Sequence, residues 1–234
     1  MKLSDEFGQE IDFDIAPDIT KIAVNCSGGA DSSILLHMVC DYLKQQGRTD
    51  AKVSVLTCGN ALKGRWNPRK AADVINYIDA ALDFNQFDIH YSYYRDRQQV
   101  TYFHEIEKKL FEDKRTQLVV SGLTANPTVE AIVENSKGEL INLADEALPE
   151  RNAGGNVTYG ETAWGGKFYM PFSNVDKRFI ASMYRQYGVD DLFDLTRSCE
   201  AIPDSGKPYD PAFENTPCGT CWWCLERKWA FGRL

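Results

Sequence analysis

The sequence predicts a doubly wound α/β protein with a mostly parallel sheet and a small metal-bound segment near its C-terminal end. Short apolar runs, typical of buried strands, alternate along the chain with longer segments of helical periodicity. Parallel strands need a crossover between them, usually a helix, so this alternation favours a parallel sheet with helices on both faces. Four cysteines crowd the last part of the chain, which indicates a metal site there.

Composition favours an ordinary globular protein that acts on small molecules. With 43% apolar and 26% charged residues, a chain of 234 residues can bury a substantial core. We expect one α/β domain over residues 1–195 and a C-terminal segment over residues 196–234. The net charge of −8 argues against nucleic acid as the main partner. No apolar run approaches the length of a membrane span and the first residues lack a signal-peptide core, so we expect a cytoplasmic protein without a membrane partner.

Glycine, proline and small polar residues mark several ends of the expected elements. Gly47 ends the first helix, because glycine readily adopts the left-handed conformation found there. Pro68 suits the first turn of the second helix. Ser173 or Asn174 could cap a later helix. The expected order is a lead-in strand or edge segment within residues 1–19, strand 22–24, helix 30–46, strand 51–58, helix 68–82, strand 87–93, helix 98–114, strand 117–121, strand 168–172 and helix 176–184.

The turn between the first strand and the first helix is the best candidate binding site. A strand that bends through glycines into a helix directs several backbone N–H groups into one concavity, and the helix dipole adds positive potential there. Such a place suits a phosphate or pyrophosphate group. Asp31 could hold Mg²⁺ in the same turn. The alternative without a binding role is a tight turn capped by serines. The residues expected to bind the nucleotide here are Ser27, Gly28, Gly29, Asp31, Ser32 and Ser33.

Other polar residues are expected at the carboxyl edge of the sheet, where α/β proteins bind ligands. Ser121 and Gly122 follow the fourth strand and form a second candidate lining of the nucleotide crevice. Arg65 and Arg69 follow the second strand and could meet an anionic group, or they belong to a solvated helix start. Lys177 could place a cation beside a polyphosphate, although a surface lysine is the alternative.

Residues 126–167 lose the regular pattern and are rich in Asn, Gly and Glu. Only residues 144–148 suggest a short helix. Long irregular stretches in compact domains are usually functional or mobile, so we interpret this one as a substrate-covering insertion, with an inert loop as the alternative.

The four C-terminal cysteines have the spacing of a closed metal site. Four thiolates can complete a tetrahedral Zn²⁺ shell, and such a shell is structural rather than catalytic. The loop before the last three cysteines is rich in proline and would benefit from a crosslink. A Cys-x-x-Cys redox or sulfur-carrying site and an iron–sulfur cluster, which uses the same ligands, are the alternatives. The expected ligands are Cys199, Cys218, Cys221 and Cys224.

The phrase Ser27-Gly-Gly-Ala-Asp-Ser32 resembles the PP-loop of the ATP pyrophosphatase superfamily, whose members cut ATP between the α- and β-phosphates. That resemblance implies an adenine nucleotide alpha hydrolase-like, Rossmann-like fold. The C-terminal phrase from Cys218 to Phe231 is similar to the zinc segment of the 7-cyano-7-deazaguanine synthase family, QueC. The phrases 195–199 and 171–177 also resemble that family.

The resemblance implies a ligase that forms carbon–nitrogen bonds in deazaguanine and queuosine-type biosynthesis. That family uses ATP to activate 7-carboxy-7-deazaguanine as an adenylate, converts it with ammonia to an amide, and dehydrates the amide to a nitrile with a second ATP. ATP, Mg²⁺ and Zn²⁺ would then be the cofactors, with Asp31 and Lys177 as catalytic residues. Two phrases around the family's deazapurine have no counterpart here, and one of their places is held by residues 124–130.

The resemblance therefore leaves open the acceptor substrate, the choice between an amide and a nitrile product, and the ammonia source, which is free ammonia or an amidotransferase. The oligomeric state is also open, and a homodimer is among the alternatives. Two alternatives of function remain. One is a PP-loop enzyme that modifies RNA by thiolation. The other is a catalytically silent zinc module that senses nucleotide.

Overall fold

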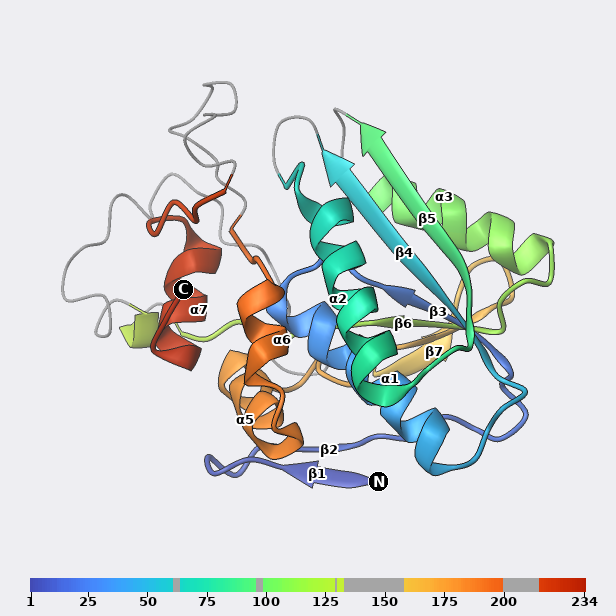
Figure 1. Cartoon of the computed structure of the whole chain (residues 1–234), viewed down its shortest axis with the longest axis horizontal. Coiled ribbons are helices and arrows are strands. Elements are labelled where there is room, and N and C mark those ends of the chain that lie inside the picture. Colours follow the sequence, from blue (N-terminus) through green and yellow to red (C-terminus); the bar gives the residue numbers. More distant parts are fainter. Residues whose placement is uncertain (61–63, 96–98, 129, 133–157, 200–214) are drawn as a thin grey trace.

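The computed structural model describes residues 1–60, 64–95, 99–128, 130–132, 158–199 and 215–234 (Figure 1). The strands of its main sheet are β3 (Lys21–Asn25), β4 (Lys52–Asn60), β5 (Phe87–Arg95), β6 (Leu118–Ser121), β7 (Tyr159–Glu161) and β8 (Lys167–Tyr169). They lie in the order β5-β4-β3-β6-β8-β7. All neighbours are parallel except β7, which pairs antiparallel with β8. The predicted mostly parallel α/β sheet is confirmed.

Helices cover both faces of the sheet (Figure 1). Their bounds are α1 (Ala30–Gln45), α2 (Asn67–Leu82), α3 (Gln99–Glu112), α5 (Lys177–Tyr187), α6 (Asp190–Leu195) and α7 (Trp222–Phe231). Side chains alternate between the faces along each strand. Val120 accordingly belongs to the large core under α1 and α2, whereas Val119 packs with Ile106 and Leu110 of α3.

The N-terminal residues form a hairpin of their own instead of an edge of the main sheet. Strands β1 (Lys2–Ser4) and β2 (Glu10–Asp12) pair antiparallel in a separate two-stranded sheet. Asp5 closes the hairpin, since its Oδ1 accepts from the backbone N–H groups of Phe7 and Gln9 at 2.9 and 2.8 Å. A short strand was expected within residues 1–19, and β2 lies there; its pairing with β1 in a separate hairpin closed by Asp5 was not predicted.

Three further differences concern residues after β6. The N-cap of α5 is Asp176, whose carboxylate accepts from the backbone N–H of Arg178 at 2.8 Å, and not Ser173 or Asn174. Strand β7 and the start of β8 lie within the stretch predicted to be irregular. The short helix α6 was not predicted. The helix expected at 144–148, and most of the predicted insertion, lie outside the described residues.

The order of the strands creates a switch point beside β3. The chain runs from β3 to β4 and β5 on one side, then crosses back to β6 on the other side. Ligands of doubly wound sheets bind outside the carboxyl ends of the strands at such a point. At that edge Asn25 of β3 pairs with Ser121 of β6, so the turns that follow these two strands are neighbours.

In the part of the chain that the structure describes, no helix combines the length and the apolar character needed to cross a membrane.

Candidate nucleotide and metal site

A cavity of about 300 Å³ lies at the switch point. It brings together most of the residues that the sequence analysis singled out. The predicted residues that line it are Ser27, Gly29, Asp31, Ser32, Ser121, Gly122, Lys177 and Cys199. The turn after β3, the turn after β6, the start of α5 and the cysteine-rich segment therefore share one cavity.

The turn from Ser27 to Ser33 is tightly held by its own hydroxyl groups. Ser33 Oγ is buried and donates to the carbonyl of Gly29 at 2.7 Å, while Ser32 Oγ donates to the same carbonyl at 3.2 Å. The N–H of Gly29 in turn donates to Ser27 Oγ at 3.3 Å. Ser27 and Ser32 also line the cavity, but the described lining does not include Ser33. Ser33 thus supports the turn, but no side chain caps α1, whose N-cap is Gly29.

Two glycines allow chain segments to approach one another closely. Gly28 has a φ of +73°, and a Cβ there would lie 2.4 Å from the Cβ of Lys70. Both the left-handed backbone and the contact with α2 therefore require glycine. A Cβ on Gly122 would lie 3.1 Å from the carbonyl carbon and oxygen of Asp31. The turn after β6 consequently lies directly against the first turn of α1.

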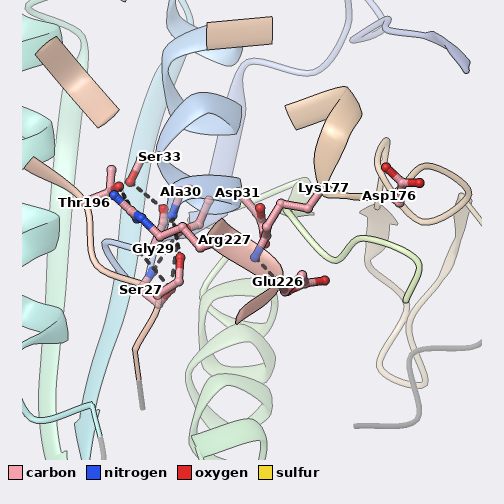
Figure 2. Close-up of polar contacts among 12 residues, drawn as sticks. Ser27, Gly29, Ala30, Asp31, Ser33, Asp176, Lys177, Thr196, Glu226 and Arg227 are labelled. Atoms are coloured by element: carbon pink, nitrogen blue, oxygen red, sulfur yellow. Dashed lines mark hydrogen bonds and ion pairs between the residues drawn. The ribbon is translucent and has the colours of Figure 1, made fainter. Parts of the chain in front are cut away.

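Asp31 and Lys177 line the cavity and form a chain of charges with the buried Glu226 (Figure 2). Lys177 Nζ lies 3.1 Å from Asp31 Oδ2 and 2.9 Å from Glu226 Oε2. The side chains of Lys177 and Glu226 are 1% and 0% exposed, whereas that of Asp31 is 19% exposed. The predicted lysine is therefore buried, which excludes the alternative of a surface lysine. Glu226 was not recognised from the sequence, because it lies 49 positions from its partner.

The arginine after Glu226 anchors α7 rather than lining the cavity. Arg227 donates to Thr196 Oγ1 at 2.7 Å (Figure 2), and it also donates to the carbonyl of Phe193 at 3.1 Å. Its guanidinium also lies 3.8 Å from the centre of the Phe193 ring. Burial lowers the pKa of Arg227 to about 10. These contacts join α7 to α6 and so fix the helix that carries Glu226.

The residues just before Cys199 contact the glycine turn directly. The N–H of Arg197 donates to the carbonyl of Gly28 at 2.8 Å, and the N–H of Ala30 donates to Ser198 Oγ at 3.4 Å. Arg197 and Ser198 both line the cavity. The Arg197 guanidinium lies 3.5 Å from the centre of the Trp66 ring. Both belong to the phrase 195–199 that resembles the QueC family, but neither was expected at the site.

Asn25 adds a polar group at the carboxyl end of β3. It lines the cavity, and its Nδ2 donates to Glu107 Oε1 of α3 at 2.8 Å. Burial raises the pKa of Glu107, and the hydrogen bond from Asn25 opposes that effect. The pair connects the cavity to the helix on the opposite face of the sheet. Neither residue was expected at the site.

Arg65 and Arg69 are exposed, and the described lining of the cavity does not include them. Arg69 donates to Asn215 Oδ1 at 3.5 Å. Gly64 and Asn67 of the same segment do line the cavity. The role of the two arginines in binding substrate therefore stays a prediction.

The four predicted metal ligands converge. The Sγ atoms of Cys199, Cys218, Cys221 and Cys224 all lie within 4.8 Å of one another, and three of the four residues are buried. Four thiolates bound to one Zn²⁺ at about 2.3 Å lie roughly 3.8 Å apart, so small movements would complete a tetrahedral shell. An iron–sulfur cluster separates its thiolates by several atoms and needs more space. The residues present fit a single metal ion, and Cys199 places that site beside the cavity.

No protein-family model matches this chain, and no curated protein matches it. Among solved structures it is similar to the U34-tRNA thiolase NcsA from Methanococcus maripaludis with its [4Fe-4S] cluster, at 12% identity and a TM-score of 0.41. That match covers 75% of this chain and 60% of the thiolase, so the chain spans about three fifths of its length. The chain is also similar to NMN synthetase from Francisella tularensis, at 10% identity and a TM-score of 0.43, over 93% of this chain and 79% of that one. At these values neither likeness adds to the site described above.

Proposed function

We propose that this chain is an ATP-dependent ligase of the PP-loop type, which activates a carboxylate or amide as an adenylate and releases pyrophosphate. The observation that carries the proposal is the position of the glycine turn. It lies at the switch point, at the start of α1, with Asp31 and Lys177 at the same cavity. A phosphate-binding turn of this kind needs N–H donors and a positive helix end, which the turn and the start of α1 provide, and Asp31 would supply a place for a metal ion.

The residues of the turn would hold the pyrophosphate half of ATP. Within the described residues, the N–H groups of Gly29 and Ala30 make long hydrogen bonds, of 3.3 and 3.4 Å, to serine hydroxyls. A charged phosphate oxygen is the stronger acceptor and would take these donors. Ser27 and Ser32 line the cavity and could donate their hydroxyls as well. Donors directed at the charge that grows on the leaving group are worth a few kcal/mol each.

The chemistry follows from this placement. An oxygen of the acceptor forms a bond to the α-phosphorus of ATP, and the bond from that phosphorus to the bridging oxygen breaks, so pyrophosphate leaves. The protein mainly positions the reactants and neutralises charge. Asp31 would hold Mg²⁺, which neutralises the polyphosphate when bound. Lys177 would add a positive charge beside it.

The cysteine cluster would hold a structural Zn²⁺ in this scheme. Its closed set of four thiolates leaves no position for substrate. Arg197 and Ser198 precede Cys199 and contact the glycine turn, so a metal ion here would fix one wall of the nucleotide site.

For the acceptor we propose 7-carboxy-7-deazaguanine with ammonia as the second substrate, free or from an amidotransferase. The support is the resemblance of the two ends of the chain to the QueC family. The product would be the amide or the nitrile. A cytoplasmic location and a role in deazaguanine biosynthesis belong to the same proposal.

An incubation of the purified protein with ATP, Mg²⁺, ammonia and 7-carboxy-7-deazaguanine tests this function. We expect AMP, pyrophosphate and the amide or nitrile, detected by mass spectrometry. Asp31→Ala should abolish all three products. Asp41→Ala, on the same helix but outside the described lining of the cavity, is the matched control and should retain them. Wild-type turnover by the Asp31 variant would refute the assignment.

A thiolation enzyme is the second candidate, because Cys199 brings a sulfur atom to the wall of the cavity. It predicts AMP formation that depends on RNA rather than on the deazapurine acid. Nucleotide binding without any turnover would instead favour the silent sensing module. The net charge of −8 counts against RNA, and the same assay with tRNA added decides between the candidates.

A further inference from the structure

Lys177 is shared between two carboxylates, and only one of them belongs to the described lining of the cavity. Asp31 lines the cavity and is partly exposed, while Glu226 is completely buried behind it. Figure 2 shows the lysine between the two acids, reaching from α5 toward α1 and α7. The three side chains together carry one net negative charge.

This arrangement bears directly on whether Asp31 can bind a cation. A lysine paired with Asp31 alone would neutralise it and compete with any metal ion for the same oxygens. Glu226 offers Lys177 a second acceptor, at 2.9 Å against 3.1 Å for Asp31. An ammonium group has three N–H donors and can satisfy both acids. With the lysine charge compensated by Glu226, the Asp31 carboxylate keeps its negative charge toward the cavity.

We propose that Glu226 is a positioning residue that keeps Asp31 available for a divalent cation by holding Lys177. Polyphosphate would then bind here together with its metal ion rather than alone. The inference rests on the proposed function, in which Asp31 holds Mg²⁺. Glu226 follows Cys224 by two residues on α7, so the cysteine cluster and the Arg227 anchor both fix its place.

Calorimetry with inorganic pyrophosphate, on the full chain purified with zinc, tests the inference at a series of Mg²⁺ concentrations. In Glu226→Gln, Lys177 turns to Asp31, so the Mg²⁺ concentration for half-maximal binding should rise about tenfold or more, the lower end of the effect of a neighbouring charge. Affinity for pyrophosphate without Mg²⁺ should rise at the same time, because the site loses a negative charge. Opposite changes in the two affinities are the expected signature.

A merely structural role for Glu226 would lower both affinities together, and that result would overturn the inference. Unchanged Mg²⁺ dependence would overturn it equally. Glu226→Asp keeps the charge but retracts it by one methylene, so it should shift Mg²⁺ dependence in the same direction by a smaller factor, and it serves if the Gln variant does not fold.

Glu6→Gln is the matched control, because Glu6 pairs with Arg185 of the same helix α5 and does not belong to the described lining of the cavity. Its Mg²⁺ dependence should equal that of the wild type, and a shift as large as that of Glu226→Gln would overturn the inference. Failure of the wild type to bind pyrophosphate even with Mg²⁺ would overturn the proposed function itself, and this inference with it.

Discussion

Lys177 carries the one positive charge among the three side chains of Asp31, Lys177 and Glu226, and replacement of Lys177 by Met removes that charge. Met matches the unbranched shape of the lysine chain but lacks the ammonium group. Glu226, which is 0% exposed, would then keep a charge inside the protein after losing its ion pair with Lys177. Breaking a buried ion pair in this way costs about 3–5 kcal/mol, far more than the pair itself contributes. Asp31 is 19% exposed, so water can reach it and it adds less to the loss.

Urea unfolding followed by tryptophan fluorescence, with zinc present, measures this loss in the free energy of unfolding. In thermal unfolding of a chain of this size, the same loss of about 3–5 kcal/mol would lower Tm by about 6–20 °C. The double variant Lys177→Met/Glu226→Gln removes both charges, so it should be more stable than the single variant, by about 2 kcal/mol or more, although the Gln amide still needs partners. A single variant within about 1 kcal/mol of the wild type, or a double variant less stable than the single, would show that the buried charges do not determine stability here.

Gly28→Ala should cost about 1–3 kcal/mol in urea unfolding, because it combines a φ of +73° with a Cβ only 2.4 Å from a lysine side chain. Gly8→Ala, at +80° in open space, is its control, and equal losses would contradict the packing argument. Burial lowers the pKa of His37 to about 4, so the unfolded state binds more protons between pH 4 and about 6.5. Stability should therefore fall by up to about 3 kcal/mol as the pH drops through that range, and a His37→Gln variant with the same slope would disprove the assignment. Removal of the metal ion by a chelator should change the fluorescence of Trp66 and Trp223, which pack against the cysteines; release of zinc with an unchanged spectrum would contradict a structural role.

The fold was predictable because strands and helices leave local patterns in a sequence. Ile22, Ala23 and Val24 form a continuous apolar run, as expected for a strand buried on both faces, and β3 is the central strand beside the switch point. Gly28 marks a left-handed turn that few other residues adopt. The spacing of the cysteines likewise restricts which ligands can reach one metal ion. The first two signals lie within one element or one turn, and the third depends on the spacing of the cysteines along the chain.

The errors in the predicted elements arose where the local sequence allowed more than one helix cap or turn. Ser173, Asn174 and Asp176 could all cap a helix, and Asp176 does so while its carboxylate also accepts from Gln9 of the N-terminal hairpin. That hairpin in turn depends on Asp5, which closes a turn that the period-two pattern did not predict. The contact between Asp176 and Gln9 crosses the fold and the contacts of Asp5 are local, but in both cases a specific side-chain hydrogen bond, rather than propensity, decided the structure.

The sequence by itself determined a parallel α/β sheet, a glycine turn suited to phosphate and a group of cysteines suited to a metal ion, since these depend on spacing along the chain. Only the tertiary structure decided that Lys177 is buried between Asp31 and Glu226, and that Arg197 donates its backbone N–H to Gly28. Partners so far apart in sequence are brought together by the strand order and by the packing of α7 on α5 and α6. No local pattern in the sequence predicts that packing, so the arrangement of charges at the site is known only from the tertiary structure.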